Sequence, residues 1–280
     1  MDFKKFSKLV LVEQTFFALP FAYLGVLFAG GGTVLTWVWV TLAMTGARTA
    51  GMSFNRLIDA QIDAANPRTS DRLLPRGEVT RAQVWTVAAV SSALLVFSSF
   101  MLNELCFYLS FAAIALLFSY SWFKRFSATS HFYLGFVEAA APIGGYLAVT
   151  GEFHYVPFVL GFAIMTWIGG LDIVYALQDK DFDRETGLYS IPAKLGEKGA
   201  LVFSAAAYVL ASGALVAAGA LTARGTAYWV ATGCVMLIFF HQQRLARRDD
   251  LAGSVREFFR VNMFISPVLF LGTFIDVIWI

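Results

Sequence analysis

The chain has 280 residues, of which 58% are hydrophobic, 16% aromatic and only 14% charged. A soluble domain of this length needs more charged surface, so the composition excludes a soluble enzyme or binding module and indicates a polytopic helical membrane protein. The formal net charge of +2 favours no class of partner by itself, and we expect no nucleic-acid partner and no obligatory protein partner.

Apolar runs divide the chain into nine expected transmembrane helices, because a helix needs about 20 mostly apolar residues to cross a bilayer. No small-residue cleavage site follows the basic N-terminal segment, so we interpret the first run as a retained span. Cys106 and Cys234 lie in apolar stretches, which excludes a disulfide framework and a zinc site. The expected fold class is therefore all-α, with spans at about 9–30, 34–57, 81–102, 104–123, 131–150, 155–178, 199–222, 226–243 and 257–279.

Lysine and arginine residues lie on alternate connections between these spans, and such residues mark the cytoplasmic side. All 21 basic residues except Arg48 and Arg224 fall on that side. We therefore expect a multi-pass protein of the cell's inner (plasma) membrane, with a cytoplasmic N-terminus and the C-terminus on the opposite side. Two long polar connections, at about 58–80 and 179–198, are expected to cap one central cavity within a single domain, residues 1–280.

Two acidic clusters lie where the second and sixth expected spans end. Asp59 and Asp63 are four residues apart, as are Asp179 and Asp183, so each pair can share one helix face. The same 120 residues separate the corresponding members, which suggests an internal duplication. One such pair could be only the solvated end of a helix. Two equivalent pairs on one side favour Mg²⁺ ions that bridge to a polyphosphate.

Two residues extend the first cluster along its helix. Asn55 lies one turn before Asp59 and could ligate a metal or orient a metal-bound water, or else hydrogen-bond a neighbouring helix. Arg48 lies two turns before Asn55, which is ~10 Å deeper in the bilayer. A guanidinium at that depth needs a partner, so it could receive an anionic substrate group or pair with an acid such as Glu138.

Basic residues near the clusters could hold a diphosphate group. Arg72 lies in the first long connection, while Tyr120 and Lys124 are four residues apart at the end of the fourth span. The cytoplasmic preference of basic residues explains part of this placement without any ligand.

The chain resembles the UbiA superfamily of intramembrane prenyltransferases over essentially its whole length. Four patterns carry the resemblance: Asn-x-x-x-Asp-x-x-x-Asp followed by Thr-x-x-Arg, then Tyr-x-x-x-Lys, then Asp-x-x-Tyr-x-x-x-Asp-x-x-x-Asp, and an arginine seven residues before the first Asn. They stand here at Asn55, Asp59, Asp63, Thr69 and Arg72, at Tyr120 and Lys124, at Asp172, Tyr175, Asp179 and Asp183, and at Arg48.

The resemblance implies a nine-helix fold with a central cavity capped on the cytoplasmic side. It also implies Mg²⁺-dependent transfer of a polyprenyl chain from its diphosphate to a small aromatic acceptor, with the lipid bilayer holding the tail. Two Mg²⁺ ions are expected. The expected catalytic residues are Asp59, Asp63, Asp172, Asp179 and Asp183, the metal ligands Asn55, Asp59, Asp63, Asp179 and Asp183, and the substrate-binding residues Arg48, Asn55, Arg72, Tyr120, Lys124 and Tyr175.

The acceptor is the point on which the sequence leaves alternatives open. We expect 4-hydroxybenzoate, because its activated ring carries one carboxylate that Arg48 could meet. The quinone branch of the family often has a basic residue followed by Pro early in the first span, where this chain has Val12-Glu13-Gln14-Thr15. This difference keeps open a naphthoate acceptor of menaquinone biosynthesis.

Two further alternatives concern the class of protein. The fold could serve another reaction, such as terpene cyclisation or haem farnesylation. The acids could instead bind coupling ions in a secondary transporter, although transporter sites tend to lie near the bilayer midplane rather than at the ends of helices.

Overall fold

The computed structural model describes residues 2–248 and 250–279, apart from the side chains of residues 13–17, 251, 252 and 279. Within these residues the chain is helical and contains no β-strand. The helices are α1 Phe3–Val10, α2 Val12–Phe28, α3 Val34–Ile58, α4 Ala60–Ala65, α5 Arg81–Leu102, α6 Glu104–Phe123, α7 Ser130–Thr150, α8 Tyr155–Ala176, η1 Leu177–Asp179 (a 3₁₀ turn), α9 Lys180–Thr186, α10 Ile191–Leu221, α11 Thr226–Leu245, α12 Leu251–Asn262 and α13 Ile265–Trp279.

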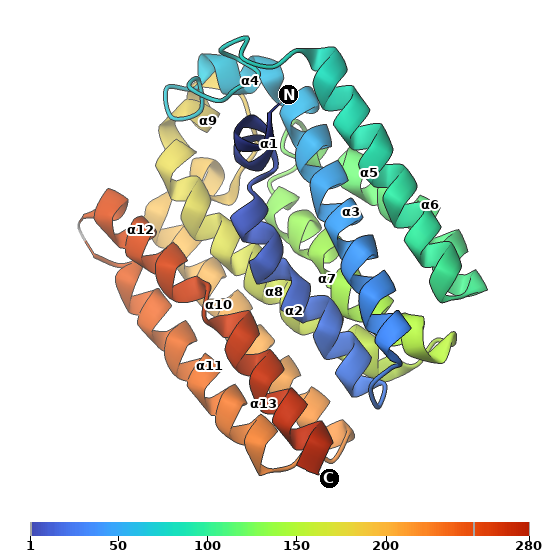
Figure 1. Ribbon diagram of the computed structural model, residues 1–280. Coiled ribbons are helices and arrows are strands. Elements are labelled where there is room, and N and C mark those ends of the chain that lie inside the picture. The colour runs from blue at the N-terminus through green and yellow to red at the C-terminus, as the bar shows by residue number, and fades with distance from the viewer. Residues whose placement is uncertain (1, 249, 280) are drawn as a thin grey trace. The chain divides into compact units, whose positions relative to one another are not determined.

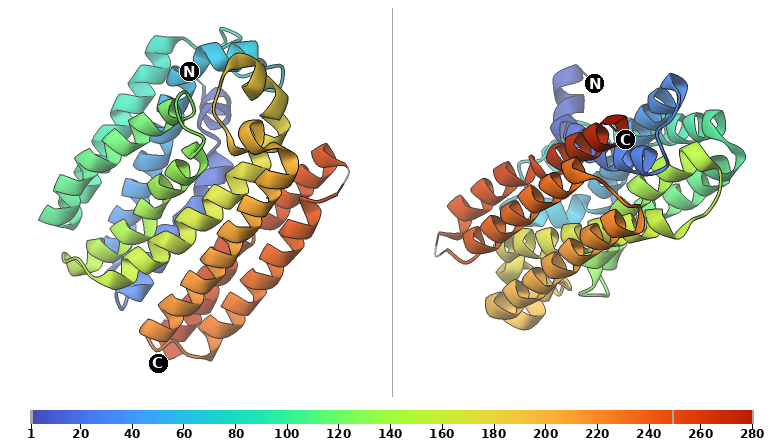
Figure 2. Two further views of the ribbon diagram at one scale, coloured as in Figure 1. Left: turned by 180° about the vertical axis from the view of Figure 1, so that it is seen from behind. Right: turned by 90° about the horizontal axis from the view of Figure 1, so that it is seen from below.

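The chain divides into two compact units, and each contains one acidic cluster. The first unit is Met1–Leu19 with Thr33–Trp122, and the second is Pro20–Gly32 with Phe123–Ile280. In the first unit α3 packs along α5, and α6 contacts α3 through the edge-to-face pair of Phe54 and Phe118. In the second unit α8 packs against both α7 and α10, and α11 packs along α13 (Figure 1 and Figure 2). The single domain expected from the sequence stays a prediction.

Each of the nine expected spans coincides with a helix or with a consecutive pair of helices. Six segments of the described chain are long and apolar enough to cross a membrane, so the chain is a multi-pass membrane protein. The other expected spans fall on α2, α3 and α11, and the count of nine stays a prediction. The six are Arg81–Leu102, Glu104–Phe123, Ser130–Thr150, Tyr155–Thr186, Ile191–Leu221 and Gly253–Ile278.

Breaks in the helices are the main difference from the expected spans. The first expected span is interrupted at Leu11, whose φ of 52° lies in the left-handed region. The last is interrupted between α12 and α13, because the ring of Pro267 would clash with the carbonyl of Met263 in a continuous helix. Helix α10 begins at Ile191, eight residues before the expected start, and bends at Gly196 (φ 69°, ψ −177°), a conformation open essentially only to glycine.

Buried polar residues join the last helices of the second unit. The amide of Gln242 on α11 donates to the Phe258 carbonyl (3.1 Å) and to Asn262 Oδ1 (3.2 Å), which supports the end of α12. The carboxylate of Asp276 on α13 accepts the N–H groups of Gly225 (3.0 Å) and Tyr228 (3.5 Å) at the start of α11. These contacts satisfy backbone groups that a helix end leaves without intrahelical partners.

Two glycines allow α2 and α7 to approach closely in the second unit. A Cβ atom at Gly25 would overlap the Pro142 carbonyl of α7, and one at Gly145 would overlap the Ala22 carbonyl of α2. Small residues at contacts of this kind let the backbones of membrane helices pack together. The two helices are therefore held at a distance that no larger residue permits at these positions.

We expect Gly145→Ala to lower the thermal unfolding midpoint, because the added methyl group has to move backbone rather than a flexible side chain. Overpacking typically costs about 1–3 kcal/mol. The adjacent Gly144 would place its Cβ with nothing within 4 Å, so Gly144→Ala is a matched control that should not lower the midpoint. Thermal unfolding of the two variants in the same detergent measures the difference, and equal midpoints would contradict the close packing.

Candidate active site

The first acidic cluster lies at a break between two helices. Helix α3 ends at Ile58, Asp59 has φ −90° and ψ 3°, and α4 begins at the next residue. The Asp59 N–H donates to the Asn55 carbonyl (2.9 Å), and the Asp63 N–H donates to the Asp59 carbonyl (2.7 Å). The four-residue spacing therefore continues through the break. Both side chains lie inside the protein, because Asp59 is 2% exposed and Asp63 is 4% exposed.

Asn55 links this cluster to α6. Its amide nitrogen donates to Asp59 Oδ2 (2.9 Å) and to Ser121 Oγ (3.0 Å). Since the nitrogen makes both bonds, the amide oxygen is the atom that can face a cation. The hydroxyl of Tyr120, next to Ser121, lies within electrostatic range of Asp59 and Arg48. The first unit thus brings together four of the expected site residues.

A turn after α4 places Arg72 on Asp63. Asn66 Oδ1 accepts the N–H of Arg68 (2.9 Å), and Thr69 Oγ1 donates to the Asp63 carbonyl (3.1 Å). From this turn Arg72 Nη1 donates to Asp63 Oδ1 at 2.6 Å. Arg72, which the sequence predicts to bind the diphosphate, therefore binds a carboxylate of the first cluster in this structure. Asp63 Oδ2 is buried and has no hydrogen-bond partner within the part of the chain that the structure describes.

The second acidic cluster repeats this local backbone. Asp179 has φ −104° and ψ 4°, close to the values at Asp59, and it precedes the short helix α9 that carries Asp183. The Asp183 carboxylate lies within electrostatic range of Asp179, Lys124 and His131. Lys124 follows α6, and its carbonyl accepts the N–H of Tyr189 (2.7 Å), which holds the loop after α9.

Asp172 and Tyr175 precede Asp179 in the second motif and lie on α8. Asp172 Oδ2 is 2.7 Å from Nδ1 of His131, a residue of α7. The ring of Tyr175 packs edge-on against Phe259 of α12, with the ring centroids 5.2 Å apart. The roles that the sequence predicts for Asp172 and Tyr175 stay predictions.

Sequence reasoning missed two partners of the expected site residues. Ser121, which binds Asn55, directly follows Tyr120, so its position beside a recognised motif was an available signal. His131 gave no such signal, because it lies 41 residues from Asp172 and outside every motif.

Comparison with known proteins assigns the chain to a family. Residues 18–268 match the model of the UbiA prenyltransferase family. The chain belongs to the UbiA prenyltransferase family. It is therefore an enzyme, a prenyltransferase of the membrane, and the resemblance found in its motifs is confirmed.

Individual relatives agree with this family. A 4-hydroxybenzoate octaprenyltransferase of Yersinia enterocolitica is 29% identical over 280 residues, covering 98% of this chain and 92% of the relative. The apo structure of a UbiA homolog from Aeropyrum pernix K1 is 33% identical, with a TM-score of 0.88 over 94% of this chain and 98% of that one. A UbiA homolog from Archaeoglobus fulgidus bound to GPP and Mg²⁺ has the same fold, with a TM-score of 0.78, 20% identity and coverage of 99% and 100%.

The donor atoms of both clusters in this prenyltransferase fit Mg²⁺. They are carboxylate and amide oxygens, which are the hard ligands that this ion prefers. Asp63 Oδ2 is a buried carboxylate oxygen without a hydrogen-bond partner among the described residues, and a cation would satisfy it. No group of three or more His, Cys, Asp or Glu suited to a metal occurs among the described residues. Mg²⁺ sites often have few protein ligands and are completed by water and phosphate.

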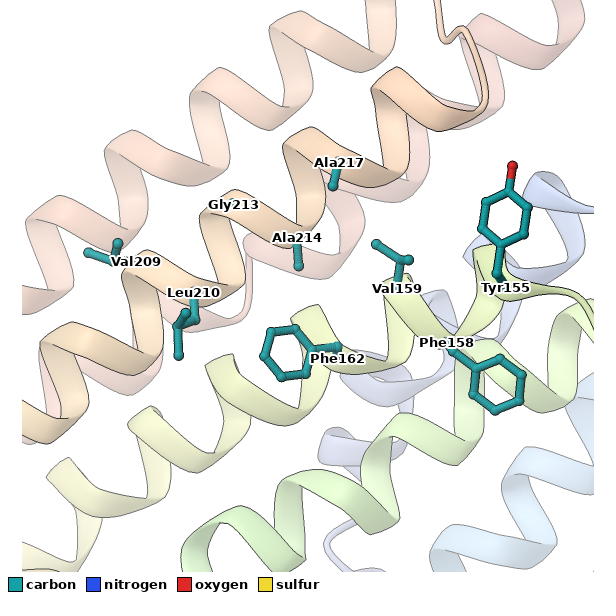
Figure 3. Close-up of a pocket in the computed structure, with 9 residues that line it drawn as sticks. All are labelled: Tyr155, Phe158, Val159, Phe162, Val209, Leu210, Gly213, Ala214 and Ala217. Atoms are coloured by element: carbon teal, nitrogen blue, oxygen red, sulfur yellow. The ribbon is translucent and has the colours of Figure 1, made fainter.

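An apolar groove of about 750 Å³ lies between α8 and α10 (Figure 3). Its lining includes Tyr155, Phe158 and Phe162 from α8 and the small residues Gly213 and Ala217 from α10. No acidic or basic side chain lines it. The groove lies toward the start of α8, whereas Asp172 lies in the last two turns of α8 and Asp179 lies beyond its end. The groove is therefore separate from the acidic cluster of this unit.

Proposed function

We propose that the chain transfers a polyprenyl group from polyprenyl diphosphate to an aromatic quinone precursor, with 4-hydroxybenzoate as the acceptor. The observation that carries this proposal is the repeated helix break, which gives each unit a pair of carboxylates four residues apart. Two equivalent pairs suit two Mg²⁺ ions on one diphosphate. The names of the curated relatives support the acceptor.

Mg²⁺ bound at Asn55, Asp59, Asp63, Asp179 and Asp183 would neutralise the charge that develops on the leaving diphosphate. Lys124 lies within electrostatic range of Asp183 and is suited to bind a phosphate oxygen near the second cluster. We assign the same role to Arg72 near the first cluster, where its guanidinium donates to Asp63 Oδ1 and is partly exposed.

The reaction breaks the bond between the first prenyl carbon and the diphosphate oxygen. An electron-rich ring carbon of the acceptor then bonds to that prenyl carbon, and the ring loses a proton. The allylic cation has to be shielded from water, which a membrane-embedded pocket does. The face of Tyr120, which lies within electrostatic range of Asp59 and Arg48, is suited to line the reaction centre.

The arrangement in the membrane forms part of the same proposal. The basic residues of the connections favour nine spans in the inner membrane, with a cytoplasmic N-terminus and the C-terminus on the opposite side. In that arrangement both acidic clusters and their capping segments face the cytoplasm, which supplies Mg²⁺ and receives the released diphosphate.

Arg48 is the residue on which the acceptor assignment depends. It lies two turns before Asn55 on α3 and within electrostatic range of Tyr120, so we assign its guanidinium to the carboxylate of an acceptor that binds near Tyr120. A naphthoate acceptor is the second possibility, favoured by Glu13 and Gln14, whose side chains lie outside the described part of the structure.

The acceptor is tested by incubating membranes that contain the protein with a labelled prenyl diphosphate, Mg²⁺ and one acceptor at a time. We expect product from 4-hydroxybenzoate, and a loss of about 10–100-fold in Arg48→Ala, because a charge-assisted hydrogen bond is worth about 1.5–3 kcal/mol. Arg244→Ala, at a basic residue outside both clusters, is the control. Product from the naphthoate alone would replace the acceptor and keep the reaction, whereas no prenylated product from either would overturn the proposal.

A further inference from the structure

His131 bonds two different helices from inside the second unit. It lies in the first turn of α7 and is 3% exposed. Its Nδ1 is 2.7 Å from Asp172 Oδ2 on α8, and its Nε2 accepts the backbone N–H of Ile191 (3.2 Å), the first residue of α10. Both ring nitrogens therefore have partners, and the partners lie on either side of the segment that contains Asp179 and Asp183.

The two partners determine where the ring carries its proton. A backbone N–H can only donate, so Nε2 must accept and is unprotonated. The neutral ring then carries its proton on Nδ1 and donates it to the carboxylate of Asp172. This bond holds one carboxylate oxygen of Asp172 in place and thereby also sets the direction of the other oxygen.

The bond to Ile191 acts on the loop that follows Asp183. Within this loop the Leu188 N–H donates to the Asp183 carbonyl (2.8 Å), and the Tyr189 N–H donates to the Lys124 carbonyl (2.7 Å). The next bond is the one from Ile191 to His131. The bonds of Tyr189 and Ile191 thus connect the loop after α9 to Lys124 and to the first turn of α7, and the Leu188 bond connects the same loop to the end of α9.

We propose that His131 is a positioning residue for the second acidic motif, acting as the Nδ1–H tautomer on Asp172 and on the loop after α9. It holds the segment that contains Asp179 and Asp183 at both ends without touching the substrate. The effect on turnover rests on the proposed function, whereas the two hydrogen bonds are properties of the protein alone. Groups that orient ligands in this way typically change activity by about 10–100-fold when they are removed.

Two substitutions separate the bonds. The amide nitrogen of Asn occupies the place of Nδ1, so His131→Asn keeps the donor to Asp172 and loses the bond to Ile191. The amide oxygen of Gln occupies the place of Nε2, so His131→Gln keeps the acceptor for Ile191 and displaces the donor. His241→Asn is the control, because His241 is exposed on α11 and contacts neither motif.

Amide hydrogen exchange of the purified full-length protein measures how well the hydrogen bonds of the loop after α9 protect its N–H groups. We expect faster exchange at residues 188–191 in His131→Ala and His131→Asn, and exchange like that of the unsubstituted protein in His131→Gln and His241→Asn. Turnover should fall about 10–100-fold in His131→Ala. Partial recovery of kcat in His131→Asn would identify the Asp172 bond as the catalytic contribution, and partial recovery in His131→Gln would identify the loop.

Nitrogen-15 NMR of histidine in the unsubstituted protein tests the tautomer even where a variant does not fold. The expected His131 spectrum has a protonated Nδ1 and an unprotonated Nε2. A protonated Nε2, or unchanged exchange and unchanged kcat in all three His131 variants, would overturn the proposal. If the unsubstituted protein transfers no prenyl group, the proposed function fails, while the exchange and NMR results still decide the role of His131.

Discussion

Asp63→Ala and Asp183→Ala are each expected to remove nearly all Mg²⁺-dependent prenyl transfer while the protein still inserts into the membrane. A metal ion contributes several kcal/mol of charge stabilisation to a transition state. Loss of one ligand from a site with so few carboxylates should therefore lower turnover by about 10³-fold. Turnover of labelled prenyl diphosphate in membranes, normalised to the amount of inserted protein, measures the effect.

Asp181→Ala is the matched control for this prediction. Asp181 belongs to the same short helix as Asp183, but its side chain is 78% exposed, so its loss should leave turnover nearly unchanged. The double variant Asp63→Ala/Asp183→Ala should be little worse than either single variant, because residues that act as one unit have non-additive effects. Full activity in either single variant would reject a metal site shared by the two motifs.

Arg72→Ala is expected to lower both stability and turnover. Its guanidinium is the partner of Asp63 Oδ1, and Asp63 Oδ2 has no hydrogen bond within the described residues, so the substitution leaves a buried carboxylate without side-chain partners. Removing one member of a fully buried ion pair costs about 3–5 kcal/mol. The cost should be smaller here, because the Arg72 side chain is 26% exposed. Arg72→Lys should be intermediate, since it replaces a planar fork with a point charge.

Thermal unfolding with and without Mg²⁺ distinguishes the loss of the Arg72–Asp63 ion pair from the loss of any positive charge on this connection. A cation at Asp63 would compensate for the missing guanidinium, so Mg²⁺ should raise the Tm of Arg72→Ala more than that of the unsubstituted protein. Arg76→Ala is the control, because Arg76 lies on the same connection but pairs with Glu78 at the surface. If Arg72→Ala keeps its Tm, its prenyl-diphosphate affinity and its turnover, Arg72 serves only as a cytoplasmic charge.

The sequence predicted the positions of most helices, because long apolar runs have few alternative structures in a bilayer. It also predicted that Asp59 and Asp63 stay one turn apart, since this follows from local spacing. It placed the end of a span beside Asp59 and beside Asp179, but it did not predict the short helices α4 and α9 that follow, because both segments were assigned to polar connections. The start of α10, which includes the bend at Gly196, was assigned to a polar connection because it carries Lys194 and Lys198.

Contacts between distant residues account for what the sequence left out. Arg72 was expected at the diphosphate from its charge and from its place after the first motif, and only the turn built by Asn66 and Thr69 places it on Asp63. The bond between His131 and Asp172 depends on how α7 packs against α8, which a single sequence does not encode in any local pattern.

Asp276 gives the second unit an order of assembly. Gly225 supplies no side chain to cap α11, so the first amides of that helix depend on a carboxylate 51 residues later in the chain. A ribosome makes α11 before it makes α13, so α11 is synthesised while its cap does not yet exist. Its leading N–H groups lack the Asp276 carboxylate until α13 has been made. The arrival of Asp276 then buries both partners at once, so the final membrane helix completes a helix that was synthesised well before it.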